Sequence, residues 1–129
     1  MLVGLKIENI AVIESADIVF DKGLNVLTGE TGAGKSIIID SLNAALGERT
    51  SRELIRTGSE NASVYAEFSN VSQAGEDILD EAGIEKLPDG MLTLTRRLNS
   101  SGKNTCRVNG CAVTASVLKE IGSQLINIH

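Results

Sequence analysis

Apolar and polar residues alternate along several segments of the chain, as they do in β-strands that bury one face. In the first segment, residues 2–10, Leu5 and Ile7 would point inward while Lys6 and Glu8 point outward. Further segments with strand character are residues 14–20, 24–29, 63–69 and 91–98. The sequence TCRVNGCAV at 105–113 predicts a hairpin, because Asn-Gly is a strong signal for a two-residue turn.

Helical spacing and helix caps alternate with these strands. Apolar residues recur on one face of a helix expected between residues 35 and 47: Ile38, Leu42, Ala45 and Leu46. Gly47 would end this helix. A short acidic helix is expected before Gly83, and another after Thr114, a favourable N-cap residue. Residues 48–62 are polar and predict a loop with one helical turn.

A glycine-rich segment lies between the strand at 24–29 and the helix that follows it. Its sequence GETGAGKS fits the pattern G-x-x-x-x-G-K-[ST], the P-loop. Glycines let main-chain N–H groups approach phosphates, and a helix N-terminus favours an anion at the same place. Lys35 would contact the β- and γ-phosphates, and the Ser36 hydroxyl would be a ligand of Mg²⁺. The segment therefore predicts binding of a nucleoside triphosphate.

The candidate nucleotide site comprises the motif and the residue after it: Gly29, Glu30, Thr31, Gly32, Ala33, Gly34, Lys35, Ser36 and Ile37. Lys35 is the candidate catalytic residue, and Ser36 is the candidate metal ligand. A nucleoside triphosphate and Mg²⁺ are the expected cofactors, and the P-loop alone does not choose among kinases, GTPases, helicases and transporter-type ATPases.

Composition and charge limit the choice of partners. The 129 residues suffice for one domain, whose core must be aliphatic because aromatic residues make up only 2% of the chain. Few aromatics also argue against binding single-stranded nucleic acid by base stacking. The net charge is −5, yet residues 91–111 carry four basic residues and no acidic one. DNA phosphates could bind such a local basic segment, although ordinary solvation is the favoured interpretation.

Four basic residues are candidates for contact with DNA or with a partner molecule: Arg56, Arg96, Lys103 and Arg107. Strand alternation puts Arg96 and Arg97 on opposite faces, so only one of them can join a given patch. Arg49, Arg52 and Arg56 could instead pair with neighbouring glutamates in a solvated loop.

Other signals indicate less specific roles. Cys106 and Cys111 are too few for a disulfide framework and are interpreted as reduced strand cysteines. The acidic residues between 76 and 81 are interpreted as a solvated helix face. His129 is the only histidine and ends the chain. Because we find no leader sequence and no apolar run that could span a membrane, we expect a cytoplasmic protein without a membrane partner.

The end of the chain raises a separate expectation. Ile126 and Ile128 resemble the start of a buried strand with no polar tail after it. We therefore expect residues 1–129 to be one segment of a larger protein.

Two stretches resemble the N-terminal segment of the bacterial RecN family, DNA repair proteins related to the SMC proteins. They are IENIAVIESADIVFDKGLNVLTGETGAGKSIIIDSLNAALGER and LTLTRRLNSSGKNTCRVNGCAVTASVLKEIGSQLINIH. The resemblance implies an α/β fold with α+β character, namely half of an SMC-type or ATP-binding-cassette head. In that head a mixed P-loop sheet is joined to an antiparallel β lobe. It also implies a nucleoid-associated protein of the bacterial cytoplasm.

The same resemblance implies that further parts complete the site. A coiled coil and a C-terminal head half would follow residues 1–129, and two heads of a homodimer would enclose ATP. The chain has no Walker B pair after an apolar strand and no LSGG-like signature. We therefore expect an ATPase as the full-length protein and negligible ATPase activity from this segment. The alternatives are the head of another SMC, Rad50 or RecF-type ATPase, and a stand-alone P-loop phosphotransferase.

Overall fold

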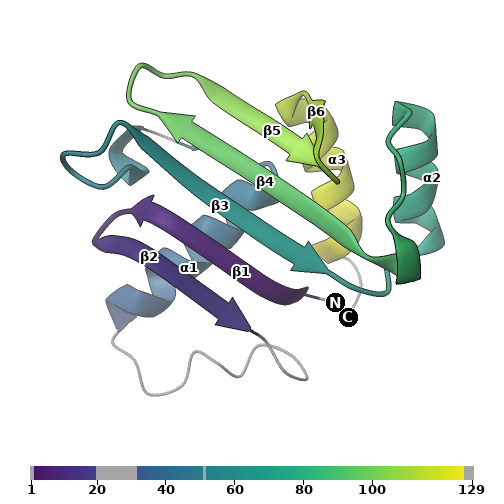
Figure 1. The fold of residues 1–129 in the computed structure, drawn as a ribbon, viewed down its shortest axis with the longest axis horizontal. Helices are drawn as coiled ribbons and strands as arrows, with labels where there is room; N and C mark the ends of the chain where they lie inside the picture. Colours follow the sequence, from purple (N-terminus) through teal and green to yellow (C-terminus); the bar gives the residue numbers. More distant parts are fainter. Residues whose placement is uncertain (1, 20–31, 51, 127–129) are drawn as a thin grey trace.

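The computed structural model describes residues 2–19, 32–50 and 52–126, which form a sheet with helices packed on one face (Figure 1). The strands are β1 (Leu2–Ile10), β2 (Ile13–Val19), β3 (Asn61–Phe68), β4 (Leu92–Asn99), β5 (Asn104–Val108) and β6 (Cys111–Val113). The helices are α1 (Gly32–Ala45), α2 (Gln73–Ala82) and α3 (Ala115–Ile126), with short 3₁₀ turns at Arg52–Leu54 and Pro88–Gly90. None of the described helices combines the length and apolar character needed to cross a membrane.

The described strands form one six-stranded sheet in the order β2-β1-β3-β4-β5-β6. Each neighbouring pair is antiparallel. This sheet corresponds to the antiparallel lobe expected from the sequence. The strand expected at 24–29, which would belong to the mixed part of the head, lies outside the described residues.

One face of the sheet is apolar and covered, and the other is polar and open. Helices α1 and α3 lie behind the sheet in Figure 1, and α2 packs beside α3. Leu5 and Ile7 are buried beneath the helices, while Lys6 and Glu8 are exposed on the open face. The inward and outward positions predicted from the alternation of β1 are thus confirmed.

The turn and cap predictions are also confirmed. Asn109 and Gly110 both have positive φ, at 51° and 81°, as a two-residue hairpin turn requires. Gly83 ends α2 in the left-handed conformation. At the start of α3 the Val117 N–H donates to the Thr114 hydroxyl at 3.2 Å. The strand expected at the end of the chain is wrong at Ile126, which is the last residue of α3. Residues 127–129 lie outside the described part.

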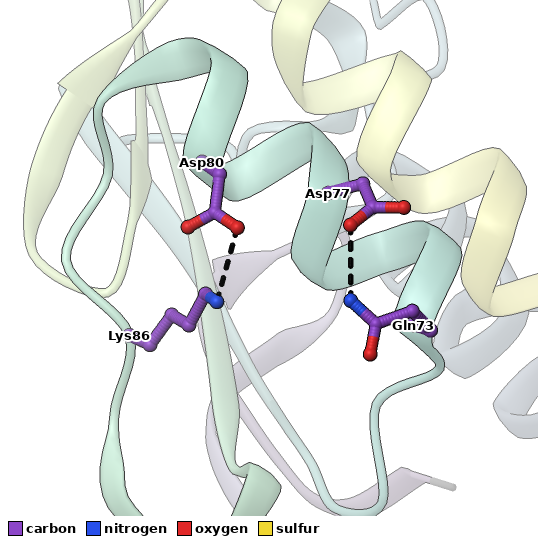
Figure 2. A network of polar contacts seen from close by, with 4 residues as sticks. All are labelled: Gln73, Asp77, Asp80 and Lys86. Atoms are coloured by element: carbon purple, nitrogen blue, oxygen red, sulfur yellow. Dashed lines mark hydrogen bonds and ion pairs between the residues drawn. The ribbon is translucent and has the colours of Figure 1, made fainter.

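The acidic side of α2 faces solvent, as expected. Asp77 accepts a hydrogen bond from Gln73 at 3.0 Å, one helical turn away, and Asp80 forms an ion pair with Lys86 at 3.1 Å (Figure 2). Both aspartates are exposed, so these contacts contribute little to stability.

The two cysteines lie in neighbouring strands and are free thiols, as predicted. Cys106 of β5 is buried on the covered face, whereas Cys111 of β6 is exposed. Burial raises the pKa of the Cys106 thiol, and the nearby positive charge of Arg96 partly opposes that effect.

Two glycines allow the end of α1 to approach α3 closely. Gly47 follows α1 with φ +94°, in the left-handed region that favours glycine, and it packs on the backbone of Lys119 in α3. A side chain at Gly122 would collide with the carbonyl oxygen of Leu46. The last turn of α1 therefore lies against α3 at a distance that only glycines permit.

We predict that Gly122→Ala destabilises the protein by about 2–3 kcal/mol, because the added methyl group has to displace a backbone carbonyl. Urea denaturation measures the change. Gly4→Ala is the matched control, since a Cβ there would meet Glu67 at an ordinary 3.6 Å. Equal stability of the two variants would contradict the close helix contact.

Candidate functional site

The described part of the candidate nucleotide site is the beginning of α1. Gly29, Glu30 and Thr31 lie outside the described residues. Helix α1 begins at Gly32, earlier in the motif than the expected start near Lys35, so Lys35 lies in its first turn. The first N–H groups of an α-helix have no partner within the helix, and they attract anions.

The described start of α1 fits a bound anion in two respects. Its first turn contains no acidic residue that would neutralise the positive end of the helix dipole. Ser36, the candidate metal ligand, is an exposed residue. Ile37, the last residue of the candidate site, is half-buried and packs against the core, so it serves to anchor the helix.

Helix α1 packs diagonally behind the central strands β1, β3 and β4. The buried face of the helix contains Ala44, Ala45 and the polar Ser41, and the buried Leu46 follows directly after it. The Ser41 hydroxyl donates to the Ile37 carbonyl at 2.8 Å, so its burial leaves no unpaired group. Small residues at 44 and 45 bring the helix backbone close to the sheet.

Arg96 of β4 contacts the other end of α1. Its side chain is 4% exposed, and its Nη1 donates to the carbonyl oxygens of Ala44 and Glu48, each at 2.9 Å. The expectation that Arg96 contacts DNA or a partner is therefore wrong, because its guanidinium points into the covered face and is engaged there. Arg96 is buried because it occupies the same face of β4 as the buried Leu94 and Leu98, and the helices cover that face.

The remaining candidate cations on β4 and β5 are exposed. Arg107 lies on the open face of β5, opposite Thr95, and Lys103 lies in the turn before β5. Arg97 is exposed on the same open face and pairs with Thr105 across the strands. The structure thus brings three cations to the β4–β5 hairpin: Arg97, Lys103 and Arg107.

Arg97 is the residue that the sequence-based selection missed. Strand alternation separates Arg96 from Arg97, but it does not tell which face the helices cover. The signal that could have identified Arg97 is the pair of leucines at 94 and 98, which share a face with Arg96 and mark that face as buried.

Two hollows lie beside Arg97, and both are also lined by Asn61. The first, of about 440 Å³, is also lined by Glu8, Asn9, Ala62 and Ser63. The second, of about 390 Å³, is also lined by Leu98, Asn99, Ser101, Lys103 and Thr105. Arg97 therefore lies between the two hollows. Glu8 contributes a carboxylate to the first hollow, and Lys103 contributes a second cation to the other.

Arg56 lies near the same end of the sheet, in the segment that follows the 3₁₀ turn. Its side chain is half-buried, and its backbone N–H donates to the Asn9 carbonyl at 2.7 Å. The segment ending at Glu60 also contacts the β4–β5 turn, through the Ser100 N–H and the Glu60 carbonyl at 2.8 Å. Arg49 is separate from this group, since it lines a hollow beside α1 with Asp40 and Glu53.

The Lys86–Asp80 contact is the one ion pair between described side chains. Pairing of Arg49 and Arg56 with neighbouring glutamates, the other interpretation of this loop, is thus not seen among the described side chains.

Comparison with known proteins gives both sequence and fold relatives. Residues 4–110 match the family of AAA domains. The chain is 46% identical over its whole length to the DNA repair protein RecN of Halalkalibacterium halodurans and 45% identical to that of Bacillus subtilis. It spans 23% and 22% of the length of these two proteins.

The fold is shared with a solved structure from work on ATP-driven dimerization and DNA-stimulated activation of SMC ATPases. The superposition covers 97% of this chain and 79% of that one, with a TM-score of 0.73 and 22% identity. At this identity the likeness concerns the fold, and it confirms the SMC-type head architecture. Because the matched residues 4–110 span most of the sequence, the chain belongs to the AAA domain family, and its resemblance to the N-terminal segment of RecN is confirmed.

Proposed function

We propose that this chain is the ATP-binding head segment of a RecN-type, SMC-like ATPase that acts in the repair and recombination of broken DNA. The observation that carries the proposal is the P-loop sequence at the start of α1, within a chain 46% identical to a RecN protein. A stand-alone P-loop phosphotransferase would share the loop but not the whole-length similarity to RecN.

In the proposed site, residues Gly29 to Ser36 hold the triphosphate of ATP. The backbone N–H groups of the loop and of the first turn of α1 bind phosphate oxygens, and Lys35 contributes a positive charge. The hydroxyl of the exposed Ser36 would be one ligand of Mg²⁺. When bound, the metal ion neutralises charge on the transferred phosphoryl group. The residues present thus bind and orient the nucleotide.

Hydrolysis requires groups that this sequence does not supply. It has no acidic Walker B pair after an apolar strand and no LSGG-like signature. We propose that the C-terminal head half of the same protein supplies the Walker B pair, and that a second head in a homodimer supplies the signature. ATP-driven dimerization, named for the SMC ATPases that share the fold, supports the second head. The full-length protein would work in the bacterial cytoplasm, in association with the nucleoid.

DNA is the proposed macromolecular partner, and the β4–β5 hairpin is its proposed contact. Arg97, Lys103 and Arg107 are exposed there, and residues 91–111 contain no carboxylate. Clustered cations bind a phosphate backbone by releasing its counterions, without reading the sequence. Arg56, in the loop that contacts this hairpin through Glu60 and Ser100, is a further candidate for contact with DNA or the partner head.

We predict that Lys35→Ala weakens binding of a non-hydrolysable ATP analogue at least about tenfold, because the variant loses the positive charge at the phosphates. Isothermal titration of the full-length protein with the analogue and Mg²⁺ measures the change. Lys86→Ala removes an exposed lysine from the loop after α2 and is the matched control. If Lys35→Ala binds as tightly as the control, the site assignment is wrong.

We expect residues 1–129 alone to hydrolyse ATP no faster than the uncatalysed background, while the full-length protein turns over. The reason is that the chain lacks the acidic pair and the signature described above. Phosphate release under identical conditions compares the two. Turnover by the isolated chain that disappears in its Lys35→Ala variant would contradict the need for other segments and favour a stand-alone enzyme.

For DNA contact, we predict that the Lys103→Ala/Arg107→Ala double variant weakens binding and lowers the salt slope of log K by about 2, which is about one per phosphate contact. Fluorescence anisotropy with duplex DNA at several salt concentrations gives the slope for the full-length protein. Lys86→Ala again serves as the control, because it lies in the loop after α2 rather than on the hairpin. An unchanged slope in the double variant would exclude Lys103 and Arg107 as phosphate contacts.

A further inference from the structure

Arg96 is a buried cation without a carboxylate partner among the described residues. Its neighbours across the strands are the uncharged side chains of Val64 and Cys106. Its Nη1 donates to the Ala44 and Glu48 carbonyls, and its buried Nε has no hydrogen-bond partner within the described part of the chain. An apolar side chain would fill this position with a smaller desolvation free energy, since burying a charge is unfavourable unless strong contacts compensate it.

The compensation comes from the C-terminus of α1. Ala44 is in the last turn of the helix and Glu48 follows the helix, so their carbonyls lie at the negative end of the helix dipole. One nitrogen of the guanidinium binds both carbonyls at 2.9 Å. Arg96 therefore joins the end of α1 to strand β4, in the middle of the sheet.

The other side of the same helix end is held by α3. Gly47 packs on Lys119, and Gly122 leaves room for the Leu46 carbonyl. These contacts are steric, whereas the two hydrogen bonds from Arg96 are directional. Together they fix both the position of the last turn of α1 and its orientation relative to the sheet.

We propose that Arg96 is a positioning residue for nucleotide binding, acting through α1; this rests on the proposed function of the P-loop. Helix α1 has 14 residues and is therefore about 20 Å long. If its last turn tilts by about 3°, its first turn moves by about 1 Å. A misplacement of about that size at reacting groups can lower a reaction rate about a hundredfold, and we expect a smaller but measurable loss of nucleotide affinity from the same displacement. Lys35 and Ser36 lie at the end that would move.

A purely structural role for Arg96 makes a different prediction. In that case its loss lowers stability, and the molecules that remain folded bind nucleotide as before. The positioning role requires that nucleotide affinity falls in fully folded protein, by more than in another variant of equal stability. The two roles are therefore separated by comparing variants matched in stability.

The experiment uses the full-length protein with Arg96→Met, Arg96→Lys and Leu79→Ala. Leu79 is buried in α2, which packs on α3, so its truncation destabilises the fold while the hydrogen bonds from Arg96 to the end of α1 stay in place. Urea denaturation gives the stability of each variant. Isothermal titration with a non-hydrolysable ATP analogue and Mg²⁺ gives Kd, at a temperature where every variant is folded.

We expect Arg96→Met to weaken nucleotide binding by about tenfold or more, Arg96→Lys to bind with intermediate affinity because its ammonium still reaches a carbonyl, and Leu79→Ala to bind like wild type. Wild-type Kd in Arg96→Met would overturn the proposal. If Arg96→Met does not fold, Arg96→Lys decides: weaker binding than Leu79→Ala supports the proposal, and equal binding overturns it. Lys35→Ala, measured alongside, shows separately whether the nucleotide site itself is correctly assigned.

Discussion

The structure depends on the burial of one face of an antiparallel sheet beneath α1 and α3. Because side chains alternate across a strand, this single packing choice sorts every strand residue into a covered or an open position. Leu5, Val64 and Leu94 share the covered face and form the aliphatic core with the helices. The opposite face is left to polar side chains, which makes it available to a partner.

Strand β4 shows the consequence most clearly, because its consecutive arginines have different surroundings. Arg96 is enclosed at the end of α1, and Arg97 lies between two hollows on the open face. One strand therefore contributes both to the position of the P-loop helix and to the basic surface of the β4–β5 hairpin. The same pleat that buries one cation exposes the next.

Helix α1 links the sheet to the proposed chemistry. Its last turn is held by β4 and α3, and its first turn contains Lys35 and the accessible Ser36. A helix held firmly at one end presents its free N–H groups at the other end in a fixed place, which is what binding of a triphosphate requires. The rest of the catalytic apparatus is proposed to come from other segments, in agreement with a chain that spans 23% of its RecN relative.

The sequence by itself determined the local features of this protein. It predicted the alternation of β1, the Asn109-Gly110 turn and the end of α2 at Gly83, because each rests on a short-range pattern or a glycine requirement. It did not determine that β1 lies between β2 and β3, that Gly122 receives the Leu46 carbonyl, or that Arg96 rather than Arg97 is buried. Those facts depend on which face the helices cover. That choice is made by contacts between residues far apart in the chain, and a local pattern does not encode it.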